Sequence, residues 1–288
     1  MLILVYTSLY FTIIGLNLKP LWYLFIPIGF SILALVFRQN ICEKGPIVKF
    51  LANIPVPTSF GITGYISVGD IDRLYPLVRR DNWGVEFDNL LFDQPIALII
   101  EQAFGPFSLL KTVFYDLLII NYFLYFLTPF IGGFILYRQF SKEFKHKIGQ
   151  FIFSICLFYI LNFLFYILVP ITGPQYFQSE YFNSDLPFSS FGKFLYFIIQ
   201  NNHYTVIDCF PSGHFGICFL VSLFLYRWNN INYLFFGLVS FFVFWATLAL
   251  RYHYLFDLVF AVVLVYVVYK LSEFLYPLKS ELTLFRQN

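Results

Sequence analysis

The stretch that decides the fold runs from Gly149 to Val169 and reads GQFIFSICLFYILNFLFYILV. It contains no charged residue and fourteen Leu, Ile, Phe or Val side chains. A membrane-spanning helix needs about 20 predominantly apolar residues, and each of these side chains favours insertion by roughly 0.3 to 0.6 kcal/mol. The sequence therefore predicts that this segment crosses a lipid bilayer as a helix.

Similar apolar runs lie on both sides of this segment, each bounded by charged residues, Asn or Pro. They cover Val113 to Tyr137, Pro211 to Tyr226, Tyr233 to Leu250 and Tyr254 to Leu271. Two further runs, Met1 to Leu16 and Leu21 to Phe37, come first, and the former is short for a span but lacks the basic segment that precedes a signal peptide. The pattern predicts an all-α protein, a polytopic membrane helical bundle of about six to seven transmembrane helices.

The remaining segments suggest how the chain is organised. We expect N-terminal transmembrane helices over residues 1–37, an extracytoplasmic or interfacial segment over 38–112, a transmembrane core over 113–272 and a cytoplasmic tail over 273–288. The segment 38–112 holds half of the acidic residues and an amphipathic run from Pro95 to Gly105, which is typical of a helix that lies in the membrane interface. Asp116 follows it near the start of an apolar run, where an acid is favoured by the helix dipole.

Composition excludes several classes of protein. The chain is 59% hydrophobic and 12% charged, whereas soluble domains are roughly 25% charged. Its net charge of +2 gives no basis for a nucleic-acid partner, which needs a strongly basic face. The four cysteines lack paired CxxC spacing, so neither a zinc site nor a disulfide framework is expected.

The short loops predict the orientation of the chain in the membrane. The loop from Arg138 to Lys147 carries four basic residues against one acid, whereas Pro170 to Phe210 carries only one Lys against three acids. Basic residues near helix ends are retained in the cytoplasm. We therefore expect Pro170 to Phe210 and the turn at Arg251 and Tyr252 on the extracytoplasmic side, which is periplasmic or luminal.

Two of the four histidines stand at helix ends on this predicted outer face. His214 closes the run PSGH, Pro211 to His214, in which Pro suits the first position of a helix. The free N–H groups of a helix start, with Gly213 permitting close approach, favour an anion such as phosphate. His253 precedes Asp257 by four residues, so on a helix the carboxylate would orient the imidazole and raise its basicity, as a nucleophile or general base requires.

Together, the PSGH run and the His253 to Asp257 pair resemble the second and third motifs of the type 2 phosphatidate phosphatase superfamily. Pro170 to Gln175 is similar to its first motif, and Arg80 to Pro95 is similar to a stretch that precedes the core in bacterial members. The resemblance covers about residues 79 to 272, which would make 113–272 a phosphatase-like core. It implies a membrane phosphatase or phosphotransferase that acts on a phospholipid, isoprenoid phosphate or pyrophosphate at the outer face.

The resemblance also implies roles for individual residues. His253 would attack phosphorus and form a phosphohistidine, Asp257 would orient it, and His214 would protonate the leaving oxygen. Ser212 and the N–H of Gly213 would bind the phosphate oxygens, where fixed donors lower the barrier. Neither a metal nor another cofactor is implied.

The sequence departs from the family pattern at two positively charged positions. Gln175 stands where the first motif ends in Arg, and Ala246-Thr247 stands where the third motif has Ser-Arg. Thr247 is instead similar to the subgroup near inositol phosphorylceramide synthases. We expect Gln175 and Arg251 to contact the phosphate. Four other cations come next as candidates: Lys193, His203, Arg79 and Arg80.

Three functions stay open at this point. The protein hydrolyses a lipid phosphate or pyrophosphate, or transfers a phospho-alcohol group to an acceptor as an inositol phosphorylceramide synthase does, or binds or transports a lipid without catalysis. The complete His-His-Asp set favours an enzyme, and the missing arginines weaken hydrolysis more than transfer.

Overall fold

The computed structural model describes residues 55–104, 109–139, 144–182, 185–201 and 203–276. This part of the chain consists of eleven α-helices and one 3-10 turn, Ser179–Tyr181, and holds no β-strand. The prediction of an all-α fold is confirmed. The apolar runs Met1 to Leu16 and Leu21 to Phe37 lie outside the described residues.

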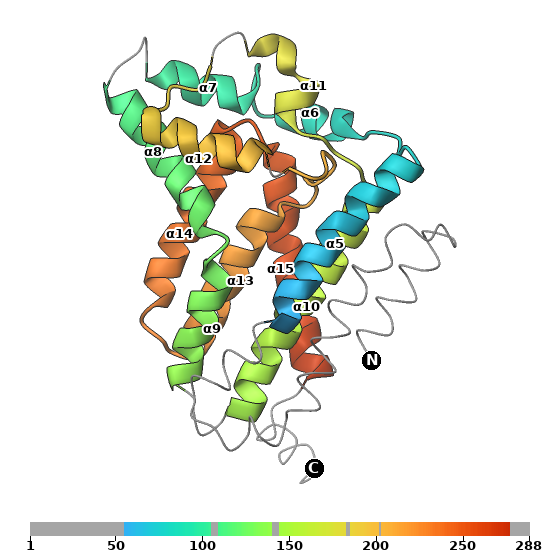
Figure 1. Ribbon diagram of the computed structural model, residues 1–288, viewed down its shortest axis with the longest axis vertical. Coiled ribbons are helices and arrows are strands. Elements are labelled where there is room, and N and C mark those ends of the chain that lie inside the picture. Colours follow the sequence, from blue (N-terminus) through green and yellow to red (C-terminus); the bar gives the residue numbers. More distant parts are fainter. Residues whose placement is uncertain (1–54, 105–108, 140–143, 183–184, 202, 277–288) are drawn as a thin grey trace.

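Four long helices form the centre of the bundle. They are α10 (Phe144–Leu168), α13 (Gly213–Arg227), α14 (Tyr233–Ala249) and α15 (Leu255–Leu275). The helix α13 contacts α14, α15 and α10, so it is the central element of the core (Figure 1). Because α13 carries the PSGH run at its start, the position of His214 is fixed by the best-packed helix.

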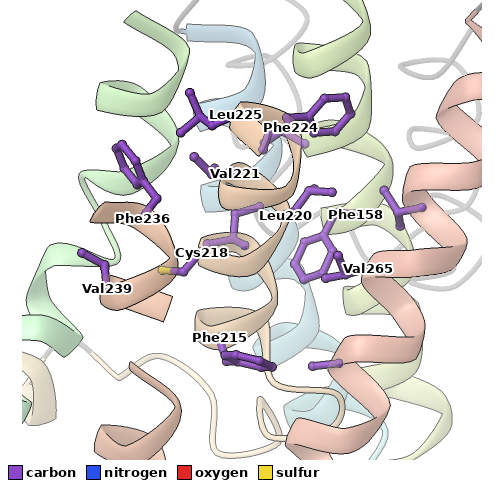
Figure 2. Packing of buried hydrophobic residues seen from close by; sticks show 14 of the residues in the cluster. Phe158, Phe215, Cys218, Leu220, Val221, Phe224, Leu225, Phe236, Val239 and Val265 are labelled. Atoms are coloured by element: carbon purple, nitrogen blue, oxygen red, sulfur yellow. The ribbon is translucent and has the colours of Figure 1, made fainter. Parts of the chain in front are cut away.

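Apolar side chains fill the space around α13 (Figure 2). On α13 itself, Leu220, Val221 and Phe224 are fully buried. The neighbouring helices contribute Phe158 from α10 and Val265 from α15 to the same cluster. In a lipid bilayer, where exposed side chains meet hydrocarbon and not water, close van der Waals packing of side chains such as these holds the helices together near the site.

The apolar run Val113 to Tyr137, which was predicted as one membrane span, is not one straight helix. It forms α8 (Leu109–Leu124) and α9 (Thr128–Gln139), which are bent by 59° at the break. Pro129 explains the break, because it has no N–H to donate to the carbonyl four residues earlier, at Tyr125, and its ring clashes with that carbonyl in a continuous helix. The run predicted as one span therefore consists of two helices that meet at a break over residues 125–127.

In the described ranges, Lys147–Leu168 and Leu255–Leu275 are long and apolar enough to cross a membrane, and the bent pair α8 and α9 makes a third if it is one span. The helices α13 and α14 are apolar but shorter. These elements agree with a helical membrane bundle, while the count of six to seven spans stays a prediction.

The segment 38–112 contains three described helices, α5 (Pro55–Leu74), α6 (Asp81–Asn89) and α7 (Ile96–Ala103). The helix α5 packs along α10, which the sequence pattern did not predict (Figure 1). A Cβ at Gly64 would lie 2.3 Å from the Phe163 ring, so this glycine permits the close approach of the two helices. The helix α7 coincides with the predicted amphipathic run and crosses one end of the bundle.

Two more helices, α11 (Pro174–Phe177) and α12 (Ser190–Asn201), lie at the same end of the bundle (Figure 1). Asp116 on α8 accepts a hydrogen bond from the N–H of Ser189 at 3.1 Å, immediately before α12 begins. Asp116 therefore caps the start of another helix, which accounts for this acid without a catalytic role.

Candidate active site

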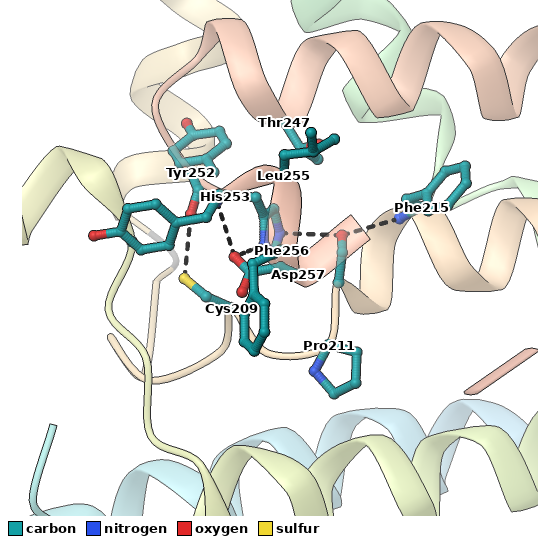
Figure 3. Close-up of polar contacts among 12 residues, drawn as sticks. Cys209, Pro211, Phe215, Thr247, Tyr252, His253, Leu255, Phe256 and Asp257 are labelled. Atoms are coloured by element: carbon teal, nitrogen blue, oxygen red, sulfur yellow. Dashed lines mark hydrogen bonds and ion pairs between the residues drawn. The ribbon is translucent and has the colours of Figure 1, made fainter. Parts of the chain in front are cut away.

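His253 lies in the turn that joins α14 to α15, and Asp257 lies in the first turn of α15. The Nδ1 atom of His253 is 3.2 Å from Oδ2 of Asp257, and the same oxygen accepts the N–H of Tyr254 at 2.9 Å (Figure 3). Both side chains are buried, with His253 3% exposed. The carboxylate favours the tautomer with the proton on Nδ1, which leaves the lone pair on Nε2.

The free nitrogen of His253 faces the start of α13. Its Nε2 atom lies 3.2 Å from Oγ of Ser212, and that oxygen accepts the N–H of Phe215 at 3.4 Å. With Nδ1 protonated, the Ser212 hydroxyl donates to Nε2. A polar chain therefore runs from Asp257 through His253 and Ser212 to the first turn of α13.

The helix α13 begins at Gly213 with Ser212 as its N-cap, not at Pro211 as was predicted. The reason is that the Ser212 side chain satisfies an N–H of the first turn, which a preceding Pro cannot do. A Cβ at Gly213 would lie 2.7 Å from the Tyr166 hydroxyl and 2.8 Å from Oδ1 of Asn162. Close packing thus requires a glycine at this helix start.

His214 is held between two tyrosines. Its ring stacks on Tyr122 of α8, with centroids 4.6 Å apart, and its Nε2 atom lies 2.9 Å from the Tyr122 hydroxyl. The Tyr125 ring packs against it at 4.4 Å. The centroids of His214 and His253 are 6.1 Å apart. A phosphate with hydrogen bonds of roughly 3 Å on each side could span two imidazoles up to about 8 Å apart, so this separation is compatible with a bridging phosphate.

The run Pro170 to Gln175 lies beside the turn that carries His253. The N–H of Gln175 donates to the carbonyl oxygen of Arg251 at 2.8 Å. On α6, Oδ1 of Asp81 accepts the N–H groups of Thr172 and Gly173 at 3.0 and 2.9 Å. The structure therefore brings the three predicted motifs together and ties the first of them to α6.

Gly173 has a conformation that other residues rarely adopt, with φ 86° and ψ 166°. A Cβ there would lie 2.2 Å from the carbonyl oxygen of Tyr252. We expect Gly173→Ala to destabilise the protein by about 1–3 kcal/mol from backbone strain, with further loss from the steric conflict. Thermal unfolding in detergent measures this. Gly237→Ala, within α14 where space is available, is the matched control and should be neutral or stabilising.

The predicted phosphate-binding side chains have other partners in the structure. The Arg251 guanidinium lies 3.1 Å from Oε2 of Glu101 and over the Phe182 ring. Oε1 of Gln175 accepts a hydrogen bond from Gln200 at 3.3 Å. Arg251 is two residues from His253, but its guanidinium is engaged by a carboxylate of α7.

The other candidate cations are also placed. Lys193 is exposed on α12, and His203 lies 3.7 Å from Asp208. Arg79 pairs with Asp72 at 2.6 Å, and Arg80 lies over the Trp83 ring. Within the described part of the chain, none of these four side chains forms a hydrogen bond or ion pair with His214, Ser212 or His253.

Burial of His253 penalises the charged imidazolium and lowers the pKa of this residue to about 4, so burial outweighs the rise in basicity that was expected from Asp257. The imidazole is therefore neutral near pH 7, as a nucleophile requires. Cys209, His253 and Asp257 place possible metal-ligand atoms within 4.8 Å of one another. The thiol of Cys209 donates to the carbonyl of Tyr252, and His253 contacts Asp257, so existing hydrogen bonds account for this cluster.

Sequence reasoning missed Asp88 as a support of the site. Its carboxylate accepts the N–H groups of Leu255 and Phe256, at 3.2 and 3.4 Å, and so caps the start of α15. Asp81 and Asp88 both fall in the stretch noted for its resemblance, which was the available signal. No pattern in the sequence points to Tyr122, because α8 and α13 come together only in the folded protein.

Asp88 predicts a pH dependence of stability. Burial raises its pKa from 3.8 to about 6, although the two backbone donors oppose this. The folded protein then holds this proton more tightly than the unfolded chain does. The stabilisation is complete below about pH 4 and is lost as the pH rises through 6. We expect thermal stability to fall over this range, and Asp88→Asn, which is always neutral, to flatten the fall. Equal slopes in both proteins would contradict the prediction.

A cavity of about 550 Å³ opens beside His214. His214, Gly213, His203 and Asp208 line one part of it. Apolar and aromatic residues of α5, α8, α9, α10 and α12 make up most of the rest. This volume lies within the range of small-molecule sites, and its polar and apolar parts suit an amphiphile.

The comparisons with known proteins give one match. A family model described as the PAP2 superfamily matches residues 90–271. No curated protein and no solved structure matches the chain. The matched range includes His214, His253 and Asp257.

Proposed function

Since the chain belongs to the PAP2 superfamily, we propose that it cleaves or transfers a phosphate-bearing group of a lipid through a phosphohistidine intermediate. Membership makes it a membrane protein of the lipid phosphatase and phosphotransferase type. The observation that carries the proposal is the separation of 6.1 Å between the rings of His214 and His253, together with the contact of His253 and Asp257 at 3.2 Å.

The proposed first step is attack by Nε2 of His253 on phosphorus. Substrate must displace the Ser212 hydroxyl from Nε2, after which this hydroxyl can donate to a phosphoryl oxygen. Asp257 holds the imidazole in place and stabilises the positive charge that forms on it. The N–H groups at the start of α13, including that of Gly213, stabilise the phosphoryl oxygens.

The proposed second group is His214, which protonates the leaving oxygen. In the next step it takes a proton from water or from an acceptor alcohol, whose oxygen attacks the phosphohistidine. General acid and base catalysis of this kind contributes typically 10²- to 10⁴-fold. Tyr122, 2.9 Å from Nε2 of His214, orients this imidazole.

A second candidate is transfer to an alcohol, as in the subgroup near inositol phosphorylceramide synthases. Neutral Gln175 and Thr247 replace two arginines, and no Lys or Arg lines the described wall of the cavity. Charge-assisted hydrogen bonds are roughly twice as strong as neutral ones, so this site suits a phosphodiester with one charge better than a dianion. Arg251 and Gln175 remain proposed phosphate-binding residues, which requires Arg251 to leave Glu101.

We propose that the site opens at the extracytoplasmic face and that 113–272 is the phosphatase-like core. The distribution of Lys and Arg in the loops supports the orientation. Labelling of a single cysteine introduced at exposed Lys193, with an impermeant thiol reagent in intact cells, tests it. Labelling only after permeabilisation would contradict the orientation.

Trapping of the intermediate tests the proposed chemistry. Purified protein is mixed with a lipid phosphate labelled at phosphorus and quenched with alkali, because phosphohistidine is stable in alkali and labile in acid. We expect label on the peptide that contains His253. Rapid turnover without label on any histidine would refute the covalent mechanism.

A further inference from the structure

The cavity beside His214 has an acidic wall. Asp208 lines it, and no Lys or Arg does so within the described residues. A phosphate dianion bound next to His214 would therefore meet a carboxylate and no Lys or Arg of the described lining. His203, which also lines the cavity, lies beside the carboxylate of Asp208. This charge distribution is the reverse of what a site for a simple phosphate monoester needs.

The carboxylate of Asp208 is buried with limited compensation. Its side chain is 9% exposed. One oxygen, Oδ2, accepts the hydroxyl of Tyr65 at 3.1 Å and lies 3.7 Å from Nε2 of His203. A buried carboxylate is costly unless it is paired or fully hydrogen-bonded, and one hydroxyl with an imidazole at 3.7 Å compensates it less than a Lys or Arg in direct contact would.

Aromatic rings surround the same space. The tyrosines that line the cavity come from α5, α8 and α10 and the short link that follows α8: Tyr65, Tyr122, Tyr125, Tyr159 and Tyr166. The faces of such rings attract cations, and quaternary ammonium groups are bound in this way by several aromatic side chains together. A buried carboxylate among tyrosine rings is thus chemically matched to an alkylammonium ion.

We propose that Asp208 and these tyrosines bind the alkylammonium group of a zwitterionic phosphodiester lipid whose phosphate lies between His214 and His253. The inference rests on the proposed function and names its substrate class. The single charge of a phosphodiester fits a site without lining arginines, and the attached cation offsets Asp208. The apolar part of the cavity, which includes Ile62 and Phe130, receives hydrocarbon.

The reaction of such a lipid balances with the groups present. A bond forms between Nε2 of His253 and phosphorus, while the bond between phosphorus and the glyceryl oxygen breaks. That oxygen takes a proton from His214 and leaves as diacylglycerol. Water or an alcohol then attacks phosphorus, gives its proton to His214 and releases His253.

The first test compares three lipids that yield the same diacylglycerol with the wild-type protein. They are phosphatidylcholine, its 3,3-dimethylbutyl isostere, in which carbon replaces the charged nitrogen, and phosphatidic acid. We expect kcat/KM for phosphatidylcholine to exceed that for each of the others at least tenfold. Equal values for the choline lipid and its isostere would overturn the inference. Equal values are the result expected if a protonated His203 already neutralises Asp208.

Variants then assign the preference to the carboxylate. Asp208→Asn should lower kcat/KM for phosphatidylcholine at least tenfold and lower that for the isostere by much less, so that the preference for choline is lost. Asp185→Asn removes an equal charge from an exposed position outside the cavity lining and is the matched control. Tyr65→Phe removes a hydrogen bond to Asp208 but leaves the negative charge of Asp208 in place, so the preference for choline should persist. Equal losses for both lipids in Asp208→Asn would indicate a structural role and overturn the assignment.

A binding measurement separates this inference from the proposed function. If wild-type protein releases diacylglycerol from none of the three lipids, the proposed function fails. Calorimetry with phosphocholine and 3,3-dimethylbutyl phosphate, on wild type and Asp208→Asn, still tests whether the cavity binds the ammonium group. We expect phosphocholine to bind wild type at least tenfold more tightly than the isostere, and this difference to vanish in the variant. Equal affinities in wild type would overturn the inference.

Discussion

His253→Ala is expected to lower the rate of lipid cleavage at least about a thousandfold, because it removes the group that forms the covalent intermediate. The structure leaves little scope for a substitute. His253 is buried, and its Nε2 faces the start of α13, where the phosphoryl group would be bound. Diacylglycerol or phosphate release from the purified variant, free of host phosphatases, measures the loss.

The control for this experiment is His253→Asn. Its amide can still donate to Asp257, whose buried carboxylate would otherwise lose one of its donors. It offers no nucleophile comparable to imidazole. We expect His253→Asn to be as inactive as the alanine variant while it unfolds at a higher temperature. Substantial turnover by either protein would show that His253 does not attack phosphorus.

His214→Ala should lower kcat for natural lipids by about 10²- to 10⁴-fold, since it removes the proposed acid and base. The loss should depend on the leaving group. An alkoxide needs a proton as it departs, whereas a nitrophenolate does not. We expect His214→Ala to retain far more of its activity on a p-nitrophenyl phosphodiester in the first half-reaction, which a burst of nitrophenolate reports.

The dependence on leaving group distinguishes proton donation from positioning. Equal loss on the lipid and on the nitrophenyl ester would mean that His214 only shapes the site. Tyr122→Phe complements the test, because it removes the hydroxyl at 2.9 Å from His214 and keeps the stacked ring. We expect a smaller loss of kcat than in His214→Ala, with the same dependence on leaving group.

Local patterns account for the parts of the fold and site that were predicted. The charge-free run Gly149 to Val169 lies in α10, whose apolar part from Lys147 to Leu168 is long enough to cross a membrane. The pairing of His253 with Asp257 follows from a separation of four residues at a helix start. Their approach to His214 was inferred from membrane topology and motif resemblance, and the ring separation of 6.1 Å agrees.

Long-range packing accounts for what was missed. The helix α5 is moderately apolar, and its contact with α10 depends on Gly64 facing Phe163, a pairing that neither segment signals alone. Asp116 was expected to interact with the dipole of its own helix but caps α12, since only the folded chain brings Ser189 beside it. The break before α9 was predictable in principle from Pro129, whose effect was outweighed by the apolar run around it.

The two carboxylates of α6 limit how far the N-terminal side of this chain can be shortened before the site is affected. Asp81 binds the Thr172 and Gly173 turn, and Asp88 caps α15. Both precede the range 90–271 that matches the family. A fragment cut at that boundary would keep both histidines but lose the anchors that hold two of the three motif loops. Expression of an isolated core, or transplantation of it into a chimaera, must therefore begin before Asp81 to retain the geometry of the site.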